Sequence, residues 1–316
     1  MTQKQEKHSP RERVGLHLYP HPQMIDTLVQ VEDAGVDHVW ISSGPSFNPD
    51  LLTTLAAAAG RTTRLKFGTY ILPAPARHPV FLAQQALSFQ AVAPDRLLLG
   101  VGTGSPALAK QLYGREVTPQ LAYLREYVQV LRQVLHQGEV HHQGRFFTAD
   151  ARLHASAQIP VFISALGPAA FRVAGEVADG ALPYACPIPY LLNTALPAMN
   201  AGAAAVSRPR PTFVGQVSVA FTEDRAIALE LGRQTLSFAA RDYRNMFLGA
   251  GFSEREIDTV ADSFVEKLMV FGSESKIKDH LQELFATEID ELAISLIGVS
   301  DPVQEQVRLA RLMGQF

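Results

Sequence analysis

The chain has 316 residues, 47% of them hydrophobic, which is enough for one large core or for two domains. Its formal net charge is −3 and its basic residues are scattered, which argues against a surface for nucleic acid. The one cysteine, Cys186, excludes an intrachain disulfide and suits a reducing compartment.

The N-terminal segment is polar and charged, and it lacks the apolar core of a signal peptide. We expect a disordered lead-in over residues 1–13 and a single domain over residues 14–316. No apolar run reaches the roughly 18 to 20 residues that span a bilayer. We therefore expect a cytoplasmic protein with neither a membrane nor a nucleic-acid partner.

From residue 14 onward, short apolar runs alternate with longer amphipathic segments. The apolar runs show little alternation, which is typical of parallel strands that are covered by helices on both faces. Eight strand–helix units in about 300 residues predict a (β/α)8 TIM barrel, an α/β fold, with a doubly wound open sheet as the alternative. The strands are expected at residues 14–19, 38–42, 65–72, 96–101, 160–164, 180–184, 212–221 and 291–297.

Repetition and loop length refine this prediction. Residues 33–42 weakly resemble residues 286–295, since both segments carry a helix end, an Asp and then a strand. Residues 115–156 are expected to form a long helix and a hairpin, and residues 223–271 extra helices. The barrel therefore has insertions after strands 4 and 7, and such insertions often form substrate walls, as could residues 45–48.

The fourth expected strand runs into a glycine-rich turn that ends at Ser105. Gly102 and Gly104 can adopt a positive φ or let a ligand approach the backbone closely. With Ala107 they fit a dinucleotide-binding spacing, but the chain about 20 residues later is helical where that fold needs a strand ending in an acid. We interpret the turn as a candidate cofactor loop, with a tight barrel turn without a ligand as the alternative.

A second candidate loop follows the fifth expected strand. Pro168 stands where a first helical residue is favoured, and the helix behind it would aim free N–H groups at residues 164–167. This is the geometry of an anion site suited to phosphate, with ordinary helix capping as the alternative. The four residues of this loop are Ser164, Ala165, Leu166 and Gly167.

In a TIM barrel the active site lies at the carboxyl ends of the strands, and few acids or bases stand there. His17 is either a buried structural histidine or a functional one. Metal-ligand spacing and a nucleophile motif are both absent from the sequence, and Cys186 has no supporting motif. Such a site favours a cofactor that carries the chemistry itself. The strand-end candidates are His17, Tyr19, Ser42, Ser43, Tyr70, Ile71, Leu72, Thr103, Gly104, Ser105, Ser164, Ala165, Leu166, Gly167, Tyr184 and Gln216.

Ordered motifs over residues 14–312 resemble the bacterial luciferase-like superfamily. Residues 68–73, 77–79 and 96–104 carry the resemblance in the first half, and residues 165–180 and 264–281 carry it in the second. The glycine strand and Arg77-His78-Pro79 are most similar to the deazaflavin branch. That branch includes methylenetetrahydromethanopterin reductase and F420-dependent glucose-6-phosphate dehydrogenase.

The resemblance implies a TIM barrel that binds coenzyme F420, or FMN in sister branches, together with a small-molecule substrate, commonly as a homodimer. It also implies a non-prolyl cis peptide between Tyr70 and Ile71, behind the central ring of the cofactor. Thr103 and Gly104 would lie beside that ring, and residues 164–167 near the phosphate. The strand-end residues Ser43 and Tyr184 complete the expected cofactor contacts, and His17, Thr103 and Ser105 are the expected catalytic residues.

Two positions depart from the deazaflavin pattern. Ser43 and Gly44 stand where the deazaflavin enzymes usually carry an Asp-His pair. Ser105 stands where the sugar-phosphate dehydrogenases place a Glu as proton donor, and a serine is a far weaker acid. We therefore do not expect oxidation of glucose 6-phosphate.

Three functions are compatible with these residues. The first is hydride transfer between F420 and a small organic substrate. The alternatives are an FMN-dependent monooxygenase that uses molecular oxygen and a cofactor-binding protein without catalysis. A phosphosugar isomerase or aldolase would need a strand-end lysine or paired carboxylates, and the sequence offers neither.

Overall fold

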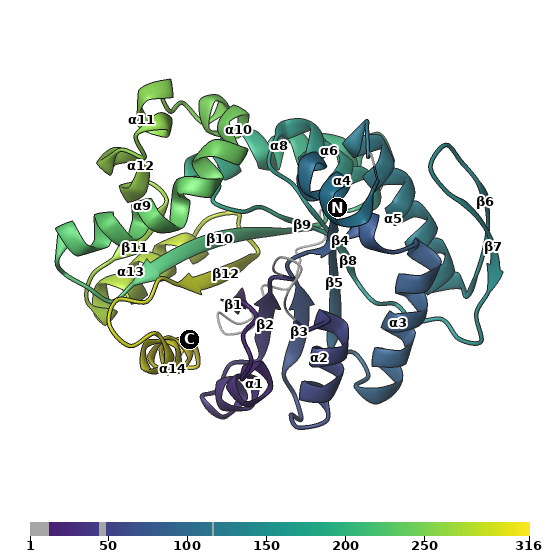
Figure 1. Ribbon diagram of the computed structural model, residues 1–316, viewed down its shortest axis with the longest axis horizontal. Coiled ribbons are helices and arrows are strands. Elements are labelled where there is room, and N and C mark those ends of the chain that lie inside the picture. Colours follow the sequence, from purple (N-terminus) through teal and green to yellow (C-terminus); the bar gives the residue numbers. More distant parts are fainter. Residues whose placement is uncertain (1–12, 44–48, 116) are drawn as a thin grey trace, which may run out of the picture.

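The computed structural model describes residues 13–43, 49–115 and 117–316, and in it eight parallel strands close into a barrel surrounded by helices (Figure 1). The last barrel strand pairs with the first, with Val14 beside Leu292, so the barrel has no open edge there. The predicted TIM barrel is therefore confirmed. In pairing order the strands are β1 (Val14–Leu18), β2 (His38–Ile41), β3 (Lys66–Thr69), β5 (Leu97–Gly102), β8 (Val161–Ser164), β9 (Gly180–Leu182), β10 (Thr212–Ala220) and β12 (Glu291–Leu296).

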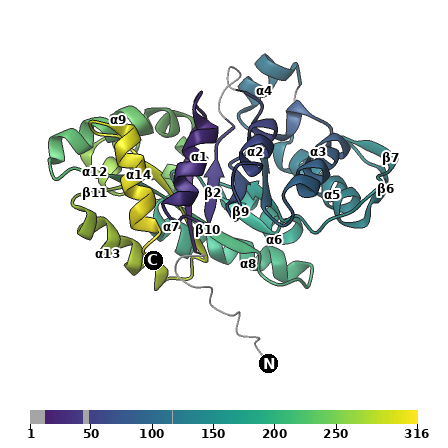
Figure 2. The same ribbon diagram turned by 90° about the horizontal axis from the view of Figure 1, so that it is seen from below.

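Helices cover the outside of the barrel, and side-chain caps begin several of them. Asp50 accepts a hydrogen bond from the N–H of Thr53 at the start of α2, and Asp301 accepts from two N–H groups at the start of α14. Figure 2 shows α14 beside α1, so the last helix completes the ring next to the first. The helices outside the insertions are α1 (Met24–Asp33), α2 (Leu51–Ala59), α3 (Pro79–Val92), α6 (Pro168–Val177), α7 (Ile188–Tyr190), η3 (Leu191–Ala195), α8 (Leu196–Ala205), α13 (Glu274–Phe285) and α14 (Pro302–Met313).

The first insertion has the predicted long helix and hairpin. It consists of α4 (Pro106–Tyr113), α5 (Gln120–Gln137) and the antiparallel strands β6 (Glu139–Gln143) and β7 (Thr148–Arg152). The Glu126 carboxylate on α5 accepts the N–H groups of Phe146 and Phe147, at 3.0 and 2.8 Å, and so ties the hairpin to the helix.

The second insertion contains the predicted helices, α9 (Arg225–Asp242), α10 (Arg244–Gly249), α11 (Glu254–Asp258) and α12 (Asp262–Glu266). It also contains β11 (Met269–Phe271), a strand that is not predicted from the sequence. This strand pairs with the end of β10, beyond the residues of β10 that pair with β9. Three apolar residues are too short a run to indicate a strand before its partner is known.

The third expected strand is divided in two. β3 ends at Thr69, and β4 (Leu72–Pro73) continues beside β5, before the short helix η2 (Ala74–Ala76). The peptide bond between Tyr70 and Ile71 is cis, at the bond that the family resemblance indicated.

Two glycines inside the barrel make room for the indole of Trp40. A Cβ atom on Gly68 would overlap that indole, and one on Gly15 would lie 2.8 Å from its Cδ1. Trp40 has no exposed surface, and its ring meets those of Tyr70 and Phe162 edge-on at 5.8 and 5.1 Å. The barrel interior is thus filled by aromatic side chains at its middle.

The beginning of the described chain is anchored. The Arg13 guanidinium donates to the carbonyls of Phe285 and Asp290, at 3.0 and 2.9 Å, and to that of Ile289. Arg13 closes the segment predicted to be disordered, and residues 1–12 of that segment lie outside the described residues. In the part of the chain that the structure describes, every helix is too short or too polar to cross a bilayer.

The Trp40 packing predicts a specific cost for one added methyl group. Gly68→Ala should lower the free energy of unfolding by about 1–3 kcal/mol, because the new methyl group overlaps the indole in a closed barrel. Urea unfolding followed by circular dichroism measures this. Gly60→Ala is the matched control, since a Cβ there meets only the Ala57 carbonyl oxygen, at 3.5 Å. Equal stability of the two variants would contradict the proposed packing.

Candidate active site

Three segments that are distant in the sequence meet at Gly102, where β5 ends. A Cβ atom on Gly102 would overlap Ser164 Oγ and lie 2.9 Å from Ile71 Cδ1. The glycine loop, the cis-peptide segment and the loop after β8 therefore touch at a point that only glycine leaves open. The structure thus brings together the main parts of the site predicted from the sequence.

Ser43 and Thr69 hold the cis-peptide segment in place. The Ser43 hydroxyl donates to the Ile71 carbonyl oxygen at 2.7 Å. The Thr69 hydroxyl donates to the Gly100 carbonyl at 2.9 Å and accepts from the Gly100 N–H at 2.8 Å. Residues 44–48, which include Gly44 and the candidate wall 45–48, lie outside the described residues.

The glycine loop is fixed from one side by a residue that no sequence motif indicated. Gln120 Nε2, at the start of α5, donates to Thr103 Oγ1 at 3.0 Å and to the Gly104 carbonyl at 2.9 Å. Gly104 has φ of +64°, and a Cβ there would meet nothing within 4 Å. Ser105 is exposed at the end of the loop. The loop therefore presents Thr103 and open backbone to the same region.

The loop after β8 leads into α6 as predicted. Gly167 precedes the helix without a side-chain cap, Pro168 begins it, and a Cβ on Gly167 would meet nothing within 4 Å. The Tyr190 hydroxyl holds the loop by donating to the Leu166 carbonyl at 2.9 Å. Ala165 is buried, whereas Ser164 is half-buried. An uncapped helix start facing open space suits an anionic group.

His17 lies deeper than the loops, beneath aromatic rings. It is 1% exposed, with Nε2 3.0 Å from Ser42 Oγ and Nδ1 3.4 Å from Ser295 Oγ. Its ring centroid lies 4.6 Å from that of Tyr70. Burial lowers the pKa of His17 to about 3, so the imidazole is neutral near pH 7.

Gln216, on β10, extends the hydrogen bonding around His17. Its amide nitrogen donates to Ser295 Oγ at 2.6 Å and to Ser218 Oγ at 3.1 Å, and its oxygen accepts the Ala185 N–H at 3.1 Å. The sequence indicates Gln216 only as a strand-end residue. Its partners Ala185 and Ser295 are distant in the sequence, so no local pattern reveals these two contacts.

Tyr184 belongs to an aromatic cluster beside the site. Its hydroxyl lies 2.9 Å from that of Tyr19, and its ring lies 5.6 and 6.3 Å from those of Phe238 and Tyr243. Burial raises the pKa of Tyr184, and raises that of Tyr243 to about 12, so both are uncharged. The insertion after the seventh barrel strand therefore supplies aromatic rings next to the predicted site.

Cys186 is buried, and burial raises the pKa of its thiol. We expect slow reaction of native protein with a thiol reagent such as DTNB, and rapid reaction of one thiol per chain in urea. Fast labelling of the native protein would contradict this burial.

The neutral state of His17 predicts a pH dependence of stability. Because its pKa falls from 6.5 unfolded to about 3 folded, only the unfolded chain binds the proton as the pH drops below 6.5. The contribution of neutral His17 to the free energy of unfolding is therefore fully present above pH 6.5 and is lost progressively toward pH 3. Between pH 7.5 and 4.5 the wild type should lose about 2–3 kcal/mol more than His17→Asn, as measured by urea unfolding. Parallel pH profiles would contradict it.

Comparison with known proteins places the chain in a family. The sequence profile described as "Luciferase-like monooxygenase" matches residues 7–291. The F420-dependent glucose-6-phosphate dehydrogenase of Kineococcus radiotolerans is 30% identical over 227 residues, 66% of each chain, which is slightly less than two thirds of that relative's length. The 5,10-methylenetetrahydromethanopterin reductase of Methanopyrus kandleri is 25% identical, over 89% of this chain and 91% of the reductase.

A solved structure extends the likeness to the fold. An F420-dependent secondary alcohol dehydrogenase, in complex with an F420-acetone adduct, superposes with a TM-score of 0.79 at 18% identity, over 96% of this chain and 97% of that one. Because the family profile spans most of the chain, the protein belongs to the luciferase-like monooxygenase family.

Proposed function

We propose that this chain is an oxidoreductase that transfers a hydride between coenzyme F420 and a small organic substrate. The observation that carries the proposal is the meeting of the three loop segments at Gly102. It supplies a backbone surface, an open glycine loop and an uncapped helix start in one place. Relatives named as F420-dependent enzymes support the choice of cofactor.

The residues present fit such a cofactor. Gly104 and Gly167 leave open space where any other residue would add a side chain, and α6 begins without a cap that a phosphate would displace. In this proposal the ring is backed by Tyr70 and Ile71. The remaining contacts come from Ser43, Thr103, Gly104 and Tyr184 around the ring and from Ser164, Ala165, Leu166 and Gly167 at the phosphate.

F420, when bound, supplies the carbon that gives or receives the hydride. The protein's part is to hold and orient the substrate beside it, and such positioning can supply much of the rate. Thr103, whose hydroxyl is fixed by Gln120, and the exposed Ser105 are the side chains proposed to orient the substrate or carry its proton. His17 is proposed to act indirectly, by orienting the aromatic rings that pack against it, because it has almost no exposed surface of its own.

A second candidate function is an FMN-dependent monooxygenase. Its supporting observation is Ser43, which stands where the deazaflavin enzymes usually carry the first residue of an Asp-His pair and which here binds the Ile71 carbonyl. A third candidate, a cofactor-binding protein without catalysis, has support in Ser105, because serine is a weak proton donor.

Titration of the purified protein with each cofactor tests the proposal. We expect saturable binding of F420, which is monitored by the absorbance and fluorescence of the cofactor itself. Binding of FMN alone would overturn the F420 assignment in favour of the second function. F420 binding without turnover over a broad panel of alcohols and carbonyl compounds would favour the third. Glucose 6-phosphate should give no reduction of F420.

A variant pair connects the titration to the site. Gly102→Ala should weaken F420 binding by about tenfold or more, because its methyl group pushes Ile71 and Ser164 apart. Gly60→Ala, the same change at the end of α2, should bind as the wild type does. Equal affinities of both variants would place the cofactor elsewhere.

The homodimer and the cytoplasmic location expected from the sequence belong to the same proposal. Light scattering at micromolar concentration tests the former, and should give twice the chain mass of 34.5 kDa.

A further inference from the structure

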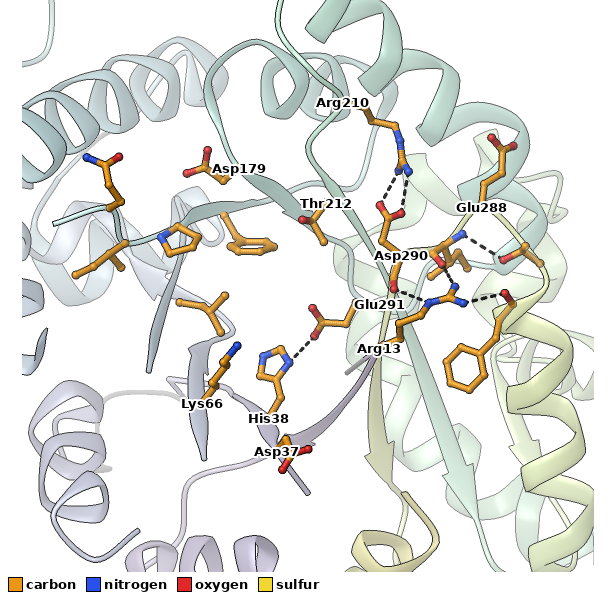
Figure 3. Close-up of a pocket in the computed structure, with 18 of the residues that line it drawn as sticks. Arg13, Asp37, His38, Lys66, Asp179, Arg210, Thr212, Glu288, Asp290 and Glu291 are labelled. Atoms are coloured by element: carbon orange, nitrogen blue, oxygen red, sulfur yellow. Dashed lines mark hydrogen bonds and ion pairs between the residues drawn. The ribbon is translucent and has the colours of Figure 1, made fainter. Parts of the chain in front are cut away.

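A cavity of about 1060 Å³ opens at the amino-terminal ends of the strands, opposite the candidate active site (Figure 3). Residues that begin barrel strands line it, among them His38, Lys66, Thr212 and Glu291. Its volume is close to the upper limit of pockets that hold small molecules, about 300–1,000 Å³. The site proposed above does not use it.

The arginines around this cavity are already engaged. Arg210 forms a bidentate pair with Asp290, at 2.7 and 2.8 Å, and Arg132 pairs with Asp179. The Arg13 guanidinium donates to three carbonyl groups, as described above. The charges of Asp179 and Asp290 are thereby offset, which reduces their repulsion of an anion, whereas Glu288 adds one more carboxylate to the lining.

Apart from the arginines, two side chains of the cavity carry a nitrogen for which the described residues supply no partner, those of His38 and Lys66. His38 is 7% exposed; its Nδ1 lies 3.0 Å from Glu291 Oε1, and its Nε2 has no hydrogen-bond partner. Lys66, which is exposed at the mouth of the cavity, is the neighbour of His38 in the parallel register and forms no ion pair within the described chain. In Figure 3 the Lys66 ammonium and the His38 ring point toward the same part of the cavity.

Glu291 fixes the orientation of His38. Its carboxylate also accepts the indole N–H of Trp40, so both of these donors are held from the barrel side. With Nδ1 turned to the carboxylate, Nε2 faces away from it. A buried ring nitrogen without a partner is costly, which indicates that another group occupies the place opposite it.

We propose that this mouth of the barrel binds a small anion through a phosphate or carboxylate group held between Lys66 and His38. The Lys66 ammonium supplies the charge, and the His38 ring, with Nδ1 held toward Glu291, directs Nε2 at the anion. The site is separate from the phosphate site proposed at α6, because it lies at the other end of the strands.

Fluorescence of Trp40, the only tryptophan in the sequence, can report binding at this cavity. Trp40 shares the Glu291 carboxylate with His38, so an anion at His38 should change Trp40 fluorescence. Inorganic phosphate and succinate are titrated separately at constant ionic strength, and isothermal calorimetry measures binding independently of the fluorescence. Saturable binding is expected for at least one probe, and the stronger probe identifies the preferred group.

Variants distinguish this site from other anion sites. Lys66→Ala and His38→Asn should each weaken binding by about tenfold, whereas Lys278→Ala, the same loss of charge on α13, should not. Gly102→Ala should retain the anion affinity, so failure of the proposed cofactor site leaves this test intact. The proposal is overturned by absence of saturable binding in both measurements, or by equal affinity of Lys66→Ala and Lys278→Ala.

Discussion

The indole of Trp40 fills the middle of the barrel, and both ends of the molecule depend on how it is accommodated. Gly15 and Gly68 face it from the neighbouring strands, where any side chain would collide with it. Burying an indole leaves one polar group, the ring N–H, which needs an acceptor inside the barrel. Glu291 provides that acceptor. A single large side chain thus dictates two glycines and one buried carboxylate.

Consequences of this packing extend to both mouths of the barrel. Toward the carboxyl ends, the ring of Tyr70 rests edge-on against the indole, and the cis-peptide segment begins at that residue. Toward the amino ends, Glu291 receives both the indole N–H and His38. The proposed cofactor surface and the proposed anion site therefore rest on opposite sides of the same ring. A substitution of Trp40 would therefore alter both proposed sites, whereas a substitution of Gly102 would alter only the proposed cofactor site and one of Lys66 only the proposed anion site.

The sequence predicted the barrel well because its strands are continuous apolar runs, and burial on both faces leaves that mark in any single strand. The predicted strand of residues 96–101 became β5 with one residue of difference at each end. The position of the cis bond came from the family resemblance. These features are local, or belong to a motif, and so can be recognised before the fold is known.

What the sequence did not predict depends on contacts between distant segments. Gln120 stands at the start of a helix and would pass as a surface residue, yet it fixes Thr103 across 17 positions of the chain. Gln216 and Ser295 meet only because β10 and β12 pair in the barrel. Glycines such as Gly68 suggest turns in a sequence, whereas here they admit an indole. Closure of the barrel creates these relations, so no window along the chain contains them.

The two copies of the weak internal repeat share a backbone pattern but carry side chains of different chemistry. Its two copies, residues 33–42 and 286–295, both lead into a barrel strand as predicted, and equivalent positions hold His38 and Glu291. In the closed barrel, His38 Nδ1 lies 3.0 Å from Glu291 Oε1, so a ring nitrogen and a carboxylate pair with one another. The two copies thus share the turn into the strand but differ in the first side chain that points into the barrel.

A similar difference is found at the other mouth of the barrel. The loop before Ser105 has the glycines of the family motif, whereas Ser105 itself stands where the sugar-phosphate dehydrogenases are expected to have an acid. The fold and the proposed cofactor site therefore depend on residues that define the backbone, and we expect the choice of reaction to depend on the few side chains that the backbone does not constrain.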